Sequence, residues 1–179
     1  MRRQFIALLR GINVGGHKKI KMADLRQMLT ELGFTKVKTL LASGNVLFEA
    51  DTTQADSLQQ TIEAGIEASF GFPVPVLIRT REAVEALVAS DPFAGIEVTH
   101  QTRLYITFLS QPPTSQLPIP YQSPDGSYHI LSVTDTEICS VLTLTGTART
   151  TDAMNILEKE FGKNITTRNW NTVLKLLDK

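Results

Sequence analysis

The sequence is poor in cysteine, with Cys139 alone among 179 residues. A single thiol excludes an intramolecular disulfide, which is usual for proteins of a reducing compartment. Cys139 lies in an apolar run, residues 138–144, so we expect it to be buried in a strand and unreactive. One thiol and three separated histidines cannot supply a closed tetrahedral zinc site. We therefore predict no structural metal, and we expect no cofactor.

Long apolar runs are also absent. Phe5–Leu9 is a run of five apolar residues that ends at Arg10. Five residues are too few for the core of a signal peptide and far too few for a membrane span. The sequence therefore predicts a cytoplasmic protein without a membrane partner.

Neither sign of charge is in excess, because 18 Lys and Arg balance 18 Asp and Glu. Bulk electrostatics therefore do not indicate a nucleic-acid-binding protein. The distribution is uneven, however. Residues 1–50 carry nine basic and three acidic side chains, a net +6, while residues 51–100 carry two and eight, a net −6. This pattern indicates either a basic face or a basic and an acidic helix side by side, both solvated.

Established catalytic patterns are missing. No Gly-x-Ser-x-Gly elbow surrounds Ser43 or another serine, and no pair of carboxylates stands out on one face. The aromatic pattern of an RNA-binding sheet is missing too, although Phe48, Tyr105 and Phe108 lie in predicted strands. The sequence leaves open whether the protein is an enzyme, and it names no catalytic residue.

Hydrophobic residues make up 42% of the chain and charged residues 20%, as in an ordinary globular protein. Phe5–Leu9 is typical of a central strand covered on both faces. Helical spacing and turn residues predict helices over 22–32 and 58–70 and strands over 37–42, 45–49 and 74–79, with a tight turn at Ser43-Gly44. Pro75 cannot donate to a ladder, so the last of these strands belongs at an edge. Residues 1–79 thus read β-α-β-β-α-β, with the first and third strands central, as in a ferredoxin-like sheet.

The pattern of residues 80–179 predicts an imperfect second copy of the β-α-β-β-α-β half. The expected elements are a helix after Thr80, strands over 104–109, 128–133, 138–144 and 165–167, a helix over 152–161 and a C-terminal helix from about 168. Residues 110–126 hold five of the eight prolines and are typical of an exposed excursion. The predicted fold class is α+β, with two ferredoxin-like βαββαβ-type halves in one compact unit, antiparallel sheets with packed helices, and a C-terminal helix.

Three stretches carry a family likeness: Ile6-Ala7-Leu8-Leu9-Arg10-Gly11-Ile12-Asn13-Val14-Gly15-Gly16, Ser43-Gly44-Asn45-Val46, and Thr166-Thr167-Arg168-Asn169-Trp170. With them the chain resembles a bacterial family known as domain of unknown function 1697. The resemblance implies a duplicated, ferredoxin-related α+β fold and no established activity. Relatives often carry a Gly-aromatic-Gly stretch followed by two basic residues and a leucine. This chain has Gly146-Thr147-Ala148-Arg149-Thr150-Thr151-Asp152 there, which keeps the first glycine, one base and the hydroxyl but lacks the second glycine, the second base and the leucine.

Gly11 and Gly16 have the spacing of a phosphate-binding P-loop and lie between a strand and a helix. A P-loop continues with Lys and then Ser or Thr, but His17 and Lys18 follow here. The predicted helix also starts several residues late, so we reject a nucleoside-triphosphate P-loop.

A looser anion site is compatible with this loop. Glycines allow consecutive N–H groups to turn toward one anion, and basic side chains surround them. The alternative is a solvated basic loop whose glycines permit a sharp reversal. The basic residues concerned are Arg10, His17, Lys18, Lys19 and Lys21.

Arg168 forms a second candidate. If Thr167 caps the last helix, Arg168 lies in the first turn, where the helix dipole disfavours a cation. Asn169 and Asn171 are poor interior helix formers as well, and such local conflict often marks a site. The alternative is that Arg168 pairs with a carboxylate while Trp170 packs in the core.

We hypothesise that Arg10, Lys18, Lys19, Arg149 and Arg168 contribute to one electropositive surface. On this hypothesis the protein binds a phosphate-bearing ligand, a nucleotide or nucleic acid, through the Arg10–Lys21 loop. The alternatives are an interaction or structural module without a small-molecule site, and an enzyme acting on a phosphorylated metabolite. The candidate binding residues are Arg10, Gly11, Asn13, Gly15, Gly16, Lys18, Lys19, Arg149, Thr150, Arg168, Asn169 and Trp170.

Overall fold

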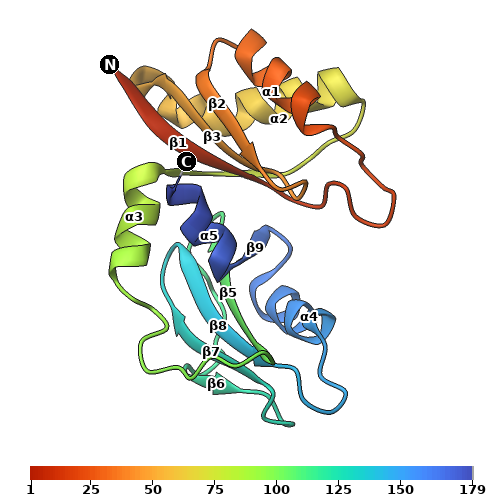
Figure 1. The fold of residues 1–179 in the computed structure, drawn as a ribbon, viewed down its shortest axis with the longest axis vertical. Coiled ribbons are helices and arrows are strands. Elements are labelled where there is room, and N and C mark those ends of the chain that lie inside the picture. The colour runs from red at the N-terminus through yellow and green to blue at the C-terminus, as the bar shows by residue number, and fades with distance from the viewer. Residues whose placement is uncertain (179) are drawn as a thin grey trace. The chain divides into compact units, whose positions relative to one another are not determined.

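Two antiparallel sheets with associated helices make up the protein in the computed structural model, which describes residues 1–178 (Figure 1). One unit comprises residues 1–89 together with the C-terminal segment from Leu174, and the other comprises residues 90–173. The predicted α+β class with two ferredoxin-like halves is confirmed. That the two halves act as one compact unit stays a prediction.

The first unit has a four-stranded sheet in the order β2-β3-β1-β4, with all neighbours antiparallel. Its strands are β1 (Arg2–Leu9), β2 (Thr35–Leu40), β3 (Asn45–Asp51) and β4 (Val76–Thr80). Its helices are α1 (Met22–Glu31), η1 (Thr52–Ser57), α2 (Leu58–Phe70) and α3 (Arg81–Ala89). The first and third strands, β1 and β3, are central, as predicted: β1 pairs with β3 on one edge and with β4 on the other.

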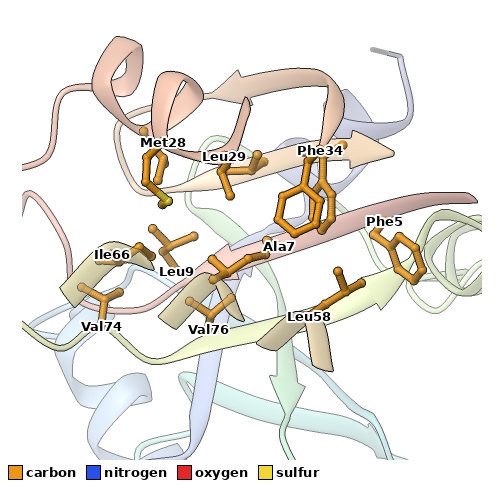
Figure 2. Packing of buried hydrophobic residues seen from close by; sticks show 14 of the residues in the cluster. Phe5, Ala7, Leu9, Met28, Leu29, Phe34, Leu58, Ile66, Val74 and Val76 are labelled. Carbon is orange, nitrogen blue, oxygen red and sulfur yellow. The ribbon is translucent and has the colours of Figure 1, made fainter. Parts of the chain in front are cut away.

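The core of this unit lies between the sheet and helices α1 and α2. Phe5, Ala7 and Leu9 of β1 point into it, and Figure 2 shows side chains of both helices closing over them. The two helices approach closely at Gly65, where an added Cβ would lie 2.9 Å from the sulfur of Met28. Residues 5–9 are all buried, which confirms that β1 is covered on both faces.

Strand β4 lies at the edge of the sheet, as the proline predicts. The strand begins at Val76, however, and Pro75 lies just before it instead of inside it. Pro75 has no N–H to donate to a ladder, although its carbonyl accepts the N–H of Arg10 at 3.0 Å. The N–H of Val76 donates instead to Glu63 Oε1 of α2, at 3.0 Å, so a helix side chain protects this part of the edge.

The turn between β2 and β3 is longer than predicted. Residues 41–44 form it, so Ala42 lies in the turn and not in the strand. Both Leu41 and Gly44 have positive φ angles, of 62° and 90°. The dipeptide Ser43-Gly44 therefore supplies half of a four-residue turn.

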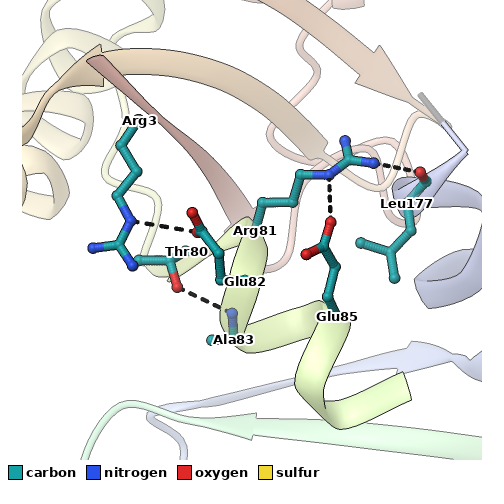
Figure 3. Close-up of polar contacts among 7 residues, drawn as sticks. All are labelled: Arg3, Thr80, Arg81, Glu82, Ala83, Glu85 and Leu177. Carbon is teal, nitrogen blue, oxygen red and sulfur yellow. Dashed lines mark hydrogen bonds and ion pairs between the residues drawn. The ribbon is translucent and has the colours of Figure 1, made fainter. Parts of the chain in front are cut away.

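Several basic side chains of the first unit pair with carboxylates of the same unit. Arg3 Nε lies 3.4 Å from Glu82, and Lys36 Nζ lies 2.9 Å from Glu49. Figure 3 shows the first of these pairs beside Arg81, which binds Glu85. Of these pairs, Arg3–Glu82 joins a basic residue of the 1–50 stretch to an acidic residue of the 51–100 stretch.

The second unit has a five-stranded antiparallel sheet in the order β6-β7-β8-β5-β9. Its strands are β5 (Thr102–Leu109), β6 (Tyr121–Gln122), β7 (Tyr128–Val133), β8 (Glu137–Thr143) and β9 (Ile165–Asn169). The order β7-β8-β5-β9 repeats that of the first sheet, and β6 is an addition at one edge. Helix α4 (Thr150–Phe161) precedes β9, and α5 (Trp170–Leu177) follows it.

The proline-rich residues 110–126 stand where the first unit has its first helix. Leu117 and Tyr121 from this segment pack on the same apolar core as α4. The segment therefore replaces a helix as a cover for the sheet, which explains why the second copy is imperfect. Cys139 of β8 is buried, as predicted, and burial raises the pKa of its thiol.

The predicted start of the last helix is wrong. Arg168 and Asn169 belong to β9, and the helix begins at Trp170. The cause is pairing with β5: Arg168 lies opposite Ile106, and the hydroxyls of Thr167 and Thr107 are 2.8 Å apart. Long-range pairing here extends the strand past the point where local pattern predicts a helix.

The turn before β7 yields a test by pH. Asp125 accepts hydrogen bonds from Ser123 Oγ at 2.6 Å, Ser127 N at 3.0 Å and Ser127 Oγ at 2.8 Å. These bonds lower the pKa of Asp125 from 3.8 to about 2. Because the folded pKa is depressed, the stabilisation is present above the unfolded pKa and is lost as pH falls toward about 2.

We therefore expect Asp125→Asn to lower the urea midpoint at neutral pH, and the difference from wild type to shrink as pH falls from about 5 to 2.5. Asp135→Asn, at an exposed aspartate in the next turn, is the control. A difference that stays constant over this range would contradict the assignment.

Candidate ligand-binding groove

Three loops of the first unit meet where β1 ends, namely residues 10–21, 41–44 and 71–75. The N–H of Leu9 donates to Gly44 O at 2.9 Å, and the N–H of Arg10 donates to Pro75 O at 3.0 Å. Lys18 Nζ donates to Pro73 O at 2.8 Å. Backbone bonds from one strand end thus bring together the two family-like motifs around Arg10 and Gly44.

Asn13 fixes the shape of the long loop. Its Oδ1 accepts from Ile20 N at 2.9 Å, and its Nδ2 donates to Ile20 O at 3.0 Å and to Ala42 O at 2.7 Å. Its φ of 56° is in the left-handed region, which asparagine tolerates better than most residues. One side chain therefore ties the start of the loop to its end and to the neighbouring turn.

The glycines of this loop allow a sharp reversal. Gly15 and Gly16 have φ angles of 59° and 77°. The N–H groups of Asn13 and His17 bond to carbonyls within the loop, at 3.1 and 3.0 Å. These two N–H groups are therefore committed to bonds within the loop.

A groove of about 780 Å³ opens beside this loop. Its charged lining residues are Lys19, Lys21 and Asp24. Lys21 stands at the N-cap position of α1 without capping it, and Asp24 lies in the first turn. The other lining residues are Asn13, Gly16, Ile20, Met22, Ala42 and Phe70. The groove thus combines two ammonium groups and one carboxylate with a largely apolar lining.

The predicted residues of the loop divide into two groups. Asn13, Gly16 and Lys19 line the groove. Lys18, whose ammonium bonds to Pro73, is not among the lining residues and braces two loops instead. Arg10, Gly11 and Gly15 belong to the same loop without lining the groove.

Sequence reasoning missed the apolar lining. The helical pattern places Phe70 and Met22 on faces that pack in the core, and both are half-buried there. The apolar pattern likewise places Ala42 in a strand. No local signal distinguishes a core side chain from one that also lines a groove, although Lys21 belongs to the predicted basic loop.

Arg149 and Thr150 lie at the start of α4 in the second unit. Asp152 Oδ2 accepts the N–H of Arg149 at 2.9 Å, so a carboxylate already occupies this helix end. The hydroxyl of Thr150 lies 3.1 Å from that of Tyr105. The side chain of Arg149 is exposed.

Arg168 is buried in β9, with 8% of its surface exposed. Its Nη1 donates to Thr166 Oγ1 at 2.7 Å and to Thr167 O at 3.1 Å, and burial lowers its pKa to about 10. Asn169 is exposed at the end of the strand. The ring of Trp170 packs edge-on against Phe93, with centroids 5.1 Å apart. These contacts give Arg168 and Trp170 a structural part in the second unit.

The candidate residues therefore belong to different units, with Arg10, Lys18 and Lys19 in the first and Arg149 and Arg168 in the second. That they form one electropositive surface stays a prediction. Within residues 1–178, no three His, Cys, Asp or Glu side chains gather as a metal site would require. Over the same residues, no helix is both long and apolar enough to cross a membrane.

The sheet order and the groove define a ferredoxin-related α+β protein with a candidate site at the loop end of its first sheet. The family model described as protein of unknown function (DUF1697) matches residues 2–138. The chain belongs to this family, which confirms the resemblance. The match ends before the Thr166–Trp170 motif.

A solved structure has the same fold. The conserved bacterial protein SP0830 from Streptococcus pneumoniae aligns with a TM-score of 0.75 at 23% sequence identity, over 99% of this chain and 98% of that one. No curated protein matches the sequence. Neither the description of the family nor the name of this neighbour states an activity, so the groove itself is the basis for a functional proposal.

Proposed function

We propose that the groove binds a small phosphate-bearing ligand, with Lys19 and Lys21 contacting the phosphate. The observation that carries the proposal is the pairing of two exposed ammonium groups with an apolar lining in one concave site. Small-molecule sites have this general character, mostly apolar with a few convergent polar groups, and volumes of roughly 300–1,000 Å³. The volume of the groove, about 780 Å³, lies in that range.

Both lysines are exposed, so salt screens their attraction for an anion. A hydrogen bond to a charged group contributes about 1.5–3 kcal/mol. Two such contacts would account for only part of the free energy of a micromolar complex, which is about 8 kcal/mol. The apolar lining must supply much of the remainder, and binding should weaken as ionic strength rises.

Charge reversal tests the proposal. Using a phosphorylated ligand found in a thermal-shift screen, we expect Lys19→Glu with Lys21→Glu to raise the Kd at least about tenfold, or about 1.4 kcal/mol. Isothermal titration calorimetry measures the Kd. The matched control is Lys38→Glu with Lys159→Glu, which changes the net charge equally at two exposed lysines outside the groove lining. Equal losses in both double variants would refute a specific site.

The rival hypothesis is an interaction module without a small-molecule site. Val14 and Leu41, on two of the loops that meet at the groove, are 65% and 53% exposed. A screen of nucleotides, phosphorylated metabolites and oligonucleotides decides between them, because a ligand at 100 times its Kd stabilises the protein by about 2.7 kcal/mol. A flat screen favours the rival hypothesis.

An enzyme acting on a phosphorylated metabolite remains the third candidate, with its catalytic group unassigned. We also propose a cytoplasmic location, because the single buried Cys139 forms no disulfide. A reporter fusion assayed in cell fractions tests this directly, and recovery with the membrane or the medium would refute it.

A further inference from the structure

We infer that the ligand of the groove is a mononucleotide, whose base lies on Phe70 and whose hydroxyl or amino groups donate to Asp24. This inference rests on the proposed function and narrows its ligand class. Two features of the lining, which lysines alone do not explain, support it: a single aromatic ring and a carboxylate.

Phe70 offers an aromatic surface at the edge of the core. The residue is half-buried and ends α2, and its ring stacks with that of Phe72, with centroids 6.5 Å apart and an interplanar angle of 30°. Both rings also pack against the core of the first unit, so the position of Phe70 is fixed before a ligand arrives. Bases of nucleotides stack on aromatic rings presented in this way, whatever the identity of the base.

Asp24 is the feature that discriminates between classes of ligand. An ionised carboxylate accepts hydrogen bonds and donates none, so it repels a bare phosphate. A ligand that fits the whole lining must therefore present an anion to Lys19 and Lys21 and O–H or N–H donors to Asp24. Inorganic phosphate meets the first requirement, and a sugar phosphate meets both. A nucleotide meets both and also supplies a flat apolar body for Phe70, Met22 and Ile20.

The groove also favours a single nucleotide over a strand of nucleic acid. Proteins that bind single strands present several aromatic side chains, on which successive bases stack. Among the described residues that line the groove, Phe70 is the one aromatic. A strand would therefore gain stacking from one base while its other bases found no ring in the groove.

Titration calorimetry on the 179-residue chain tests the inference with four probes: pyrophosphate, ribose 5-phosphate, a purine mononucleotide and an oligonucleotide of about ten nucleotides. We expect the mononucleotide to bind at least tenfold more tightly than ribose 5-phosphate, and as tightly as the oligonucleotide or more so. This comparison uses the unaltered protein and does not depend on how any variant folds.

Two variants assign the contacts. Phe70→Leu keeps much of the apolar volume and removes the ring. It should therefore raise the Kd for the mononucleotide at least fivefold and leave the Kd for ribose 5-phosphate unchanged. Asp24→Asn should raise the Kd for the mononucleotide, because it removes an acceptor for the ligand's donors. It should leave the Kd for pyrophosphate unchanged or lower it, because it removes a negative charge. The controls are Phe161→Leu, at a half-buried phenylalanine of α4, and Asp56→Asn, at an exposed aspartate.

The outcomes separate this inference from the proposed function. Equal affinity for ribose 5-phosphate and the mononucleotide, or Phe70→Leu without effect on the mononucleotide, overturns the inference and leaves a phosphate-binding groove. Tighter binding of the oligonucleotide overturns it in favour of a nucleic acid. Failure of every probe to bind overturns both.

Discussion

Replacing Gly44 by alanine is expected to destabilise the first unit by about 2–5 kcal/mol, more than any other single substitution that we propose. Gly44 has a φ of 90°, which L side chains rarely adopt. A Cβ at this position would lie 2.7 Å from Leu9 Cβ and 2.9 Å from Ile12 Cδ1, both of which are fully buried. Backbone strain and overpacking therefore add, since the Cβ of Leu9 is fixed by the backbone of β1 and cannot move away even if the Ile12 side chain turns aside.

Gly33→Ala provides the matched control. Gly33 belongs to the same unit and has a φ of 95°, but no atom lies within 4 Å of its added Cβ. Gly33→Ala should lower the free energy of unfolding only by the cost of the left-handed backbone conformation, about 1–2 kcal/mol. Urea unfolding followed by circular dichroism measures both. If the two substitutions lower the midpoint equally, the close approach of Gly44 to Leu9 and Ile12 is refuted.

Asn13→Ala is expected to have the second-largest effect, on both stability and ligand binding. The substitution removes one accepted and two donated hydrogen bonds. The bonds with Ile20 N and Ile20 O are part-buried, and the bond with Ala42 O is exposed. Loss of a partner to a part-buried backbone group costs about 1–3 kcal/mol. The loop should loosen and the groove should lose its shape, because Asn13 joins the loop to both Ile20 and Ala42, which line it.

Amide hydrogen exchange of Ile20 reports this loosening directly, since its N–H donates to Asn13. Asn13→Gly separates the loss of the side-chain hydrogen bonds from backbone strain at position 13. Glycine adopts the φ of 56° without strain but makes none of the side-chain bonds. Exchange at Ile20 should rise similarly in both variants and stay unchanged in Asn155→Ala, at an exposed asparagine of α4. Protection of Ile20 that survives Asn13→Gly would contradict the bracing role of the Asn13 side chain.

The fold was predictable where local chemistry determines it. The apolar run Phe5–Leu9 and the missing donor of Pro75 each constrain a strand's place, and together they indicate the order of the first sheet. The start of the last helix was not predictable, because Thr167 pairs across the sheet with Thr107, 60 residues away. No local pattern reports a partner at that distance.

The candidate site was predictable in part for the same reason. Lys19 and Gly16 stand out from the composition of their own loop. Phe70 and Ala42 line the groove because bonds between residues far apart in sequence, such as Asn13 to Ala42 and Lys18 to Pro73, bring three loops together. Their helical or strand-like patterns alone indicate core positions.

The most direct test of the central claim is a titration of the isotope-labelled 179-residue chain with a purine mononucleotide, monitored by the chemical shifts of its backbone amides. We predict saturable shifts centred on Gly16, Lys19–Met22, Asp24, Ala42 and Phe70, the residues of the groove. Shifts centred instead on Arg149 and Thr150 of the second unit, or no shifts at millimolar ligand, would contradict the claim that the groove binds a nucleotide.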